Sequence, residues 1–133
     1  MSGKHLFEYA VIRLVPRVER EEFINVGVIL YCAQENFLEA QWDLDEALMR
    51  LFGPALDLKV IQQHLCAFDA ICRGSEGAGP IGLLNLPGRF RWLTATRSTT
   101  MQCSKVHPGL TANPNTTLRQ LMEQLVYRHR DKI

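Results

Sequence analysis

The feature that most constrains this chain is an unbroken apolar segment at residues 26–32, which follows a charged stretch at 17–22. The segment is too short to cross a membrane, and its β-branched residues together with Gly27 favour a strand over a buried helix. Successive apolar side chains are typical of a strand that is covered on both faces of its sheet. We therefore predict a central strand at 26–33 and expect the rest of the fold to be built around it.

Three further segments alternate between the two sides of a strand in the way expected of a sheet with distinct faces. They are residues 6–15, 37–42 and 99–106. The short turn at 33–36 predicts that the central strand and the strand at 37–42 form an antiparallel hairpin. The His-Pro-Gly sequence at 107–109 predicts a turn that ends the last strand.

Apolar residues at helical spacing predict three helices. Asp43 is expected to cap the first helix, with Glu46 completing a capping box, and the helix ends at Phe52. The second helix spans 57–73 and the third begins after Asn113. The predicted inward residues are Val60, Ile61, His64, Leu65, Phe68, Ile71 and Cys72 in the second helix, and Leu118, Leu121, Met122, Leu125 and Val126 in the third.

Glycine, proline and serine punctuate residues 74–88, which predicts a long exposed loop. The amphipathic segment at 88–93 adds a helical turn. A chain of 133 residues, 47% of them hydrophobic, suffices for one domain with a sizeable core. We predict a single α+β domain over residues 1–133, with a mainly antiparallel sheet of about four strands covered by about three helices.

The net charge of +1 conceals an asymmetry along the chain. Residues 1–72 contain six Lys or Arg against eleven Asp or Glu, whereas 73–133 contain nine against three, so the two halves carry −5 and +6. This polarity has three open interpretations: charge complementarity within one fold, self-association as a homodimer, or a basic surface for an acidic partner.

The four cysteines show no Cys-x-x-Cys pair and no histidine at a familiar metal-ligand spacing. They are Cys32, Cys66, Cys72 and Cys103. We expect buried free thiols, no metal and no cofactor. The N-terminus does not resemble a secretory signal and no apolar run reaches the length of a membrane span, so the sequence predicts a cytoplasmic protein without a membrane segment.

A cluster of basic, aromatic and hydroxyl side chains in the second half is the strongest candidate binding surface. It includes Arg89, Arg91, Trp92, Arg97, Ser98 and His107. Such side chains hold phosphates, carboxylates or single-stranded nucleic acid through charge and stacking. The alternative is a solvated basic surface that only balances acidic helices.

Arg13, Asn25 and His107 are candidate site residues outside or at the end of this cluster. Arg13 lies within a predicted strand, where a buried guanidinium needs a carboxylate such as Glu22 or Glu39. Asn25 lies where the central strand begins. His107 is the candidate acid or base, because it lies at a strand end and its ordinary pKa is near neutrality.

Several of these segments resemble a bacterial family catalogued as domain of unknown function 3037. The matching pieces are 8–13, 22–30, 97–102 and 107–111, with the motif at 22–30 the most specific. The resemblance brings no activity, cofactor or catalytic residue. It implies a small cytoplasmic bacterial protein, with a kinase-like protein as a possible partner.

The sequence leaves two classes of function open. The first is a non-enzymatic binding or regulatory module that engages a protein or nucleic acid through a basic C-terminal surface. The second is a small enzyme in which Arg13, Asn25, Arg97, Ser98 and His107 converge on a phosphorylated or carboxylated small molecule. An enzyme needs these side chains in one pocket, whereas a binding module needs a broad surface.

Overall fold

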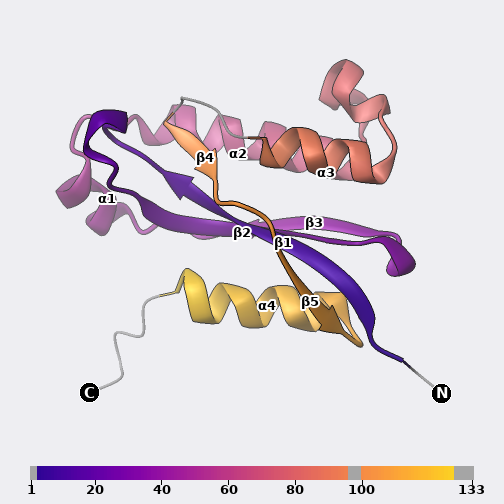
Figure 1. Cartoon of the computed structure of the whole chain (residues 1–133). Helices are drawn as coiled ribbons and strands as arrows, with labels where there is room; N and C mark the ends of the chain where they lie inside the picture. The colour runs from indigo at the N-terminus through magenta and orange to yellow at the C-terminus, as the bar shows by residue number, and fades with distance from the viewer. Residues whose placement is uncertain (1–2, 96–99, 128–133) are drawn as a thin grey trace.

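The computed structural model describes residues 3–95 and 100–127, which form one antiparallel sheet with helices on both faces (Figure 1). The strands are β1 (His5–Leu14), β2 (Ile24–Cys32), β3 (Phe37–Trp42), β4 (Met101–Cys103) and β5 (His107–Thr111). The α-helices are α1 (Glu46–Phe52), α2 (Leu58–Arg73), α3 (Leu86–Thr94) and α4 (Pro114–Leu125), with 3-10 helices η1 (Val18–Arg20), η2 (Ala33–Glu35) and η3 (Glu76–Leu83). The predicted α+β class with a mainly antiparallel sheet is confirmed.

The strand order is β3-β2-β1-β4, and β5 also pairs with β1. β2 and β3 form the predicted antiparallel hairpin, closed at η2 by Asn36 in the left-handed conformation. Gly27 is required in β2, because a Cβ there would lie 2.5 Å from the backbone oxygen of Gln41. Glycine therefore permits the close approach of β2 and β3.

The strand predicted at 99–106 is shorter than expected and is followed by a second strand. It is confirmed over β4, which ends at Cys103, whereas His107 starts β5 instead of the predicted turn, so the turn prediction was wrong. Between the strands, Ser104 bonds to β1 twice: its N–H donates to the oxygen of Val11 and its Oγ accepts from the N–H of Val11, each at 2.8 Å. Pro108 is tolerated because β5 lies at the edge of the sheet, where a missing N–H costs no ladder bond.

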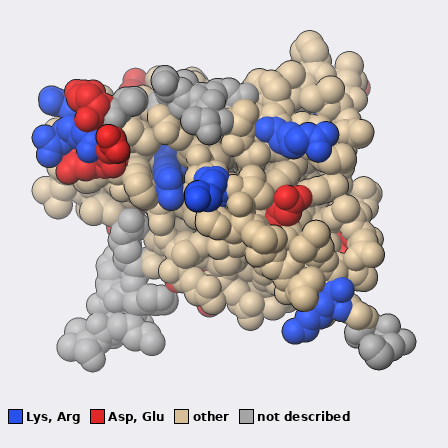
Figure 2. Space-filling view, viewed as in Figure 1, with Lys and Arg blue, Asp and Glu red and all other residues tan. Residues whose placement is uncertain are grey.

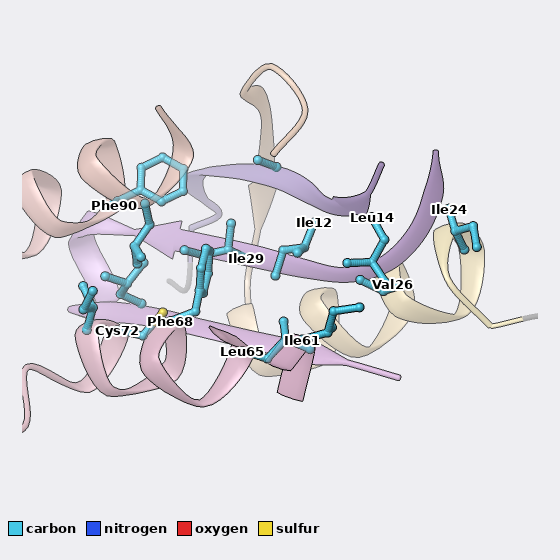
Figure 3. Packing of buried hydrophobic residues seen from close by; sticks show 14 of the residues in the cluster. Ile12, Leu14, Ile24, Val26, Ile29, Ile61, Leu65, Phe68, Cys72 and Phe90 are labelled. Atoms are coloured by element: carbon cyan, nitrogen blue, oxygen red, sulfur yellow. The ribbon is translucent and has the colours of Figure 1, made fainter. Parts of the chain in front are cut away.

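Two separate cores lie on the two faces of the sheet. On one face, side chains of β1 and β2 such as Ile12 and Ile29 pack against Leu65 and Phe68 of α2 and Phe90 of α3 (Figure 3). On the other face, Val28 and Leu30 pack against the fully buried Leu118 and Met122 of α4. β2 contributes to both cores, which confirms the prediction that the central strand is covered on both sides.

Two predictions about α1 and α2 were wrong. Asp45, not Asp43, caps α1, and its carboxylate accepts from the N–H of Leu48. Asp43 instead follows the end of β3 and donates its own N–H to the oxygen of Val26. In α2, Val60 and His64 are exposed, because Ile61 and Leu65 beside them take the face that packs on the core.

Residues 74–88 do not form the predicted long exposed loop. Gly74 ends α2 with φ = 63°, η3 follows, and Asn85 caps α3. Glycine relieves the steric cost of tight turning, so a sequence with loop-like composition folds into 3-10 turns against α2. No helix within the described ranges combines the length and apolar character needed to cross a membrane.

Candidate functional site

An open cleft lies where α2 and α3 meet β4 at the edge of the sheet. It has a volume of about 550 Å³ and a mainly apolar lining. Its lining includes Phe68, Ile71, Trp92, Leu93, Met101 and Cys103. β4, which borders the cleft, is only three residues long. Phe68, Ile71 and Leu93 are buried in the lining, whereas Trp92 is 39% exposed and offers an aromatic surface to a ligand.

A second cleft of about 560 Å³ adjoins the first and shares His64, Thr100 and Met101 with it. It runs between the start of α2 and η1 and is more polar, with Arg17 and Arg20 in its lining. We call the two clefts together the α2–α3 groove. His64 lies at their junction, whereas the sequence pattern had predicted it inside the core.

The charged rim of the groove contains one ion pair. Arg20 donates from Nε to Glu22 at 2.8 Å, and this hydrogen bond raises the pKa of Arg20 and lowers the pKa of Glu22. Both side chains are exposed, so solvent screens the attraction. Arg17 makes no ion pair within the residues that the structure describes.

The three candidate residues on α3 have different surroundings. Arg89 is half-buried and bonds internally: its guanidinium donates to the oxygen of Leu84 at 2.7 Å and to that of Cys72 at 3.5 Å. Arg91 is exposed and Trp92 lines the groove. Arg89 thus fastens α3 to the end of α2, while the next two candidates remain at the surface.

Arg13 and Asn25 are neighbours across β1 and β2. The guanidinium of Arg13 lies 4.0 Å from the ring centre of Phe23, and Asn25 donates from Nδ2 to the oxygen of Leu125 at 3.1 Å. The predicted carboxylate partners of Arg13 are absent from this site within the described chain: Glu22 bonds to Arg20, and Glu39 makes no ion pair. A cation–π contact has taken the place of the expected ion pair.

Arg13 Nε and Asn25 Oδ1 are both buried and make no hydrogen bond in the described part of the chain. Asn25 Nδ2 ties β2 to the end of α4, which indicates a structural role for Asn25.

His107 pairs with Tyr9 in the sheet, and their ring centres are 5.3 Å apart. Tyr9 packs on the core beneath α4. Arg13, Asn25 and His107 are therefore associated with the α4 side of the sheet, whereas Arg91 and Trp92 lie on the opposite side. Arg97 and Ser98 lie outside the described residues.

The cysteines are free thiols, as predicted, but they are not all buried. Cys32 and Cys72 are buried, Cys66 is exposed and Cys103 is partly exposed. Burial, with a smaller contribution from the charge of Asp69, raises the pKa of Cys72 to about 12. Among the described residues there is no group of three side chains that could hold a metal ion.

Phe68 and Ile71 line the first cleft and were predicted as core; both are buried, so that prediction is confirmed, and nothing in the sequence indicates that they also border a cleft. Trp92 was the exception, because an aromatic residue among arginines suggests a binding surface. Fold and groove together define a small antiparallel α+β domain with an open, mainly apolar groove.

This chain belongs to the family described as Protein of unknown function (DUF3037), which matches residues 9–126. The match covers most of the chain and confirms the resemblance found in its motifs. No curated protein and no solved structure matches the sequence.

Proposed function

We propose that this protein is a non-enzymatic binding module that accepts apolar side chains of a protein partner in the α2–α3 groove. The observation that carries the proposal is the mainly apolar cleft of about 550 Å³ with Trp92 partly exposed in its lining. Tryptophan in an apolar cleft is typical of the residues that dominate protein–protein affinity. Phe68 and Leu93 form the apolar floor beside it, although both are buried.

The charges around the groove favour acidic residues in the partner. Arg91 follows the buried Phe90 on α3, is exposed, and makes no ion pair in the described part of the chain. Arg17 lies in the lining of the second cleft and makes no ion pair in the described chain, although Glu22 and Asp57 line the same cleft. Complementary charge accelerates association and selects between partners. The expected ligand is an apolar segment flanked by Asp or Glu.

The two alternatives have less support. An enzyme would need His107 beside other polar groups in a pocket, but its ring packs against Tyr9 and it lines neither cleft of the α2–α3 groove. Nucleic acid binding favours a continuous row of cations. On the face shown in Figure 2, Lys and Arg side chains stand apart, or mix with acidic ones at one end.

The test compares tagged wild-type protein, Trp92→Ala and Leu83→Ala in parallel purifications from cells. Leu83 is 88% exposed on η3 and serves as the matched control for losing a surface apolar residue. We expect one protein to accompany the wild type and the control but not Trp92→Ala. With that partner purified, Trp92→Ala is expected to weaken binding by about ten-fold or more.

A second variant, Arg91→Glu, tests the charge. It is expected to slow association at low salt and to matter less at high salt. Thermal melts of every variant establish that the fold is intact. Equal retention of the partner by wild type and Trp92→Ala would contradict the proposed groove, because its central aromatic contact would then be dispensable.

A further inference from the structure

The outer edge of β3 is an open edge of the sheet. β3 pairs with β2 alone, and no backbone hydrogen bond in the described chain reaches its other side. Alternate residues of such an edge present unpaired N–H and C=O groups to solvent. β3 has six residues and no proline, whereas the opposite margin is formed by the three-residue β4 and by β5, which contains Pro108. β3 is the edge best suited to receive another strand.

A cleft runs beside this edge. It has a volume of about 360 Å³ and is bounded by β3, the C-terminal half of α2 and the start of α3. Leu38 and Ala40 line it from the strand, and Cys72 and Leu86 line it from the helices. An edge strand beside a helix, with a cleft between them, is the arrangement that binds extended peptides: the backbone pairs with the edge and alternate side chains enter the cleft.

The charge of the edge indicates what kind of strand fits. Residues 33–49 contain five acidic residues and no Lys or Arg. Glu35 lies 3.0 Å from His5 and Glu46 pairs with Arg50, whereas Glu39 and Asp43 lie outside any ion pair of the described chain. Glu39, in the middle of β3, is exposed and makes no ion pair in the described residues. Two arginines also line the cleft: Arg73 pairs with Asp69 at 2.7 Å, and Arg89 keeps its charge but points its guanidinium to the backbone oxygens of Leu84 and Cys72.

We propose that β3 is a docking edge for an extended basic segment of another protein, which adds to the sheet as a further strand. Opposite charges across paired strands are favourable and like charges are not. A second copy would bring its own acidic residues 33–49 against this edge, so self-pairing is disfavoured. β3 and β4 lie at opposite edges of the sheet. The proposed strand addition is therefore separate from the α2–α3 groove and does not depend on it.

The probe is a fluorescein-labelled peptide of alternating lysine and valine, titrated into the full-length protein and followed by fluorescence anisotropy. We expect saturable binding, together with amide chemical-shift changes concentrated in 36–43 when the protein is ¹⁵N-labelled. Glu39→Lys is expected to weaken binding by about five-fold or more. Glu76→Lys, which makes the same charge change at an exposed site on η3, is expected to have little effect.

Two further peptides separate strand addition from simple charge attraction. The same sequence with every backbone nitrogen methylated keeps its charges but cannot donate to β3, and it is expected not to bind. A peptide of alternating glutamate and valine is also expected not to bind. Equal binding of the methylated peptide would overturn the proposal. So would absence of binding by the lysine peptide, in which case the acidic edge serves only to prevent association between strands.

Discussion

The two faces of the sheet are covered in different ways. One helix, α4, packs on one face, and its Leu118 and Met122 are fully buried against β2 (Figure 1). The other face is shared by α1, α2, α3 and η3, and it has the larger core. The clefts beside α2 and α3 open on this second side. A single amphipathic helix thus closes its face, while several short elements leave open space where they meet.

This difference suggests that the α4 face serves mainly stability, whereas the proposed binding surfaces lie on the face covered by several helices. On the α4 face, one apolar stripe of the helix packs against the sheet, so close packing restricts which side chains these positions can hold. Where helices meet at the edge of a sheet, an apolar side chain such as Trp92 can stay partly exposed to a ligand. Both proposed binding surfaces lie at such boundaries: the groove between α2 and α3, and the cleft between α2 and β3.

The largest effect is expected at the closed face. Leu118→Ala deletes a side chain with no exposed surface and should lower the free energy of unfolding by about 3 kcal/mol. Trp92→Ala removes more atoms but should destabilise less, because Trp92 is partly exposed and lines a cleft that water can enter. Leu51, which is 84% exposed, gives the matched Leu→Ala control, with little expected change.

Urea unfolding of the three variants measures this order. If Trp92→Ala destabilises the protein more than Leu118→Ala, the groove is closed around Trp92 in solution. The contrast between a sealed face and an open one would then be wrong, and the proposed binding site would be part of the core.

An intermediate effect on stability is expected from the thiol of Cys72, which is buried in the core on the face that several helices cover. Burial raises the pKa of Cys72 from 9.0 to about 12. Between these values the unfolded chain releases the thiol proton while the folded chain keeps it. Stability is therefore unaffected below pH 9 and falls as the pH rises from 9 toward 12, by up to about 1.4 kcal/mol per pH unit from this group.

Chemical unfolding of wild type and Cys72→Ala across this pH range isolates the contribution of the thiol. The variant should show a shallower loss of stability with rising pH, whatever its stability at neutral pH. Cys66→Ala, an exposed thiol on the same helix, should retain the wild-type slope. Parallel curves for wild type and Cys72→Ala would show that water reaches this part of the core.

Most of the fold could be predicted from local pattern. The continuous apolar run of β2, the alternation of β1 and β3, and the capped stripe of α4 all specify their structure through neighbouring residues, and each was predicted correctly. The failures share a cause. Asp43 resembles a helix cap, but its N–H donates to the oxygen of Val26. The interruption between β4 and β5 at Ser104 depends on hydrogen bonds to Val11, more than ninety residues earlier. Long-range hydrogen bonds of this kind leave no trace in a short window of sequence.

The candidate site was harder to predict for a related reason. Chemistry-bearing residues can be recognised by type, but whether they converge depends on which face each strand presents and which helix covers it. Arg13 was expected to find a carboxylate and instead lies over Phe23, while Glu22, one of the two expected partners, bonds to Arg20. Arg89 was grouped with Arg91 by sequence, yet its orientation on α3 makes it a structural residue.

The smallest effect is expected at the rim of the open side. Arg20 lowers the pKa of Glu22, so any stabilisation by this pair exists above the ordinary pKa of a carboxyl group and disappears as the pH falls through the lowered value. Both side chains are exposed, and solvent and salt screen their attraction. Glu22→Gln should therefore leave the thermal unfolding midpoint unchanged at neutral pH, even at low salt. A clear drop in that midpoint would show that the Arg20–Glu22 pair holds η1 against the groove more tightly than the exposure of the two side chains indicates. The rim would then contribute to stability, as the α4 face does.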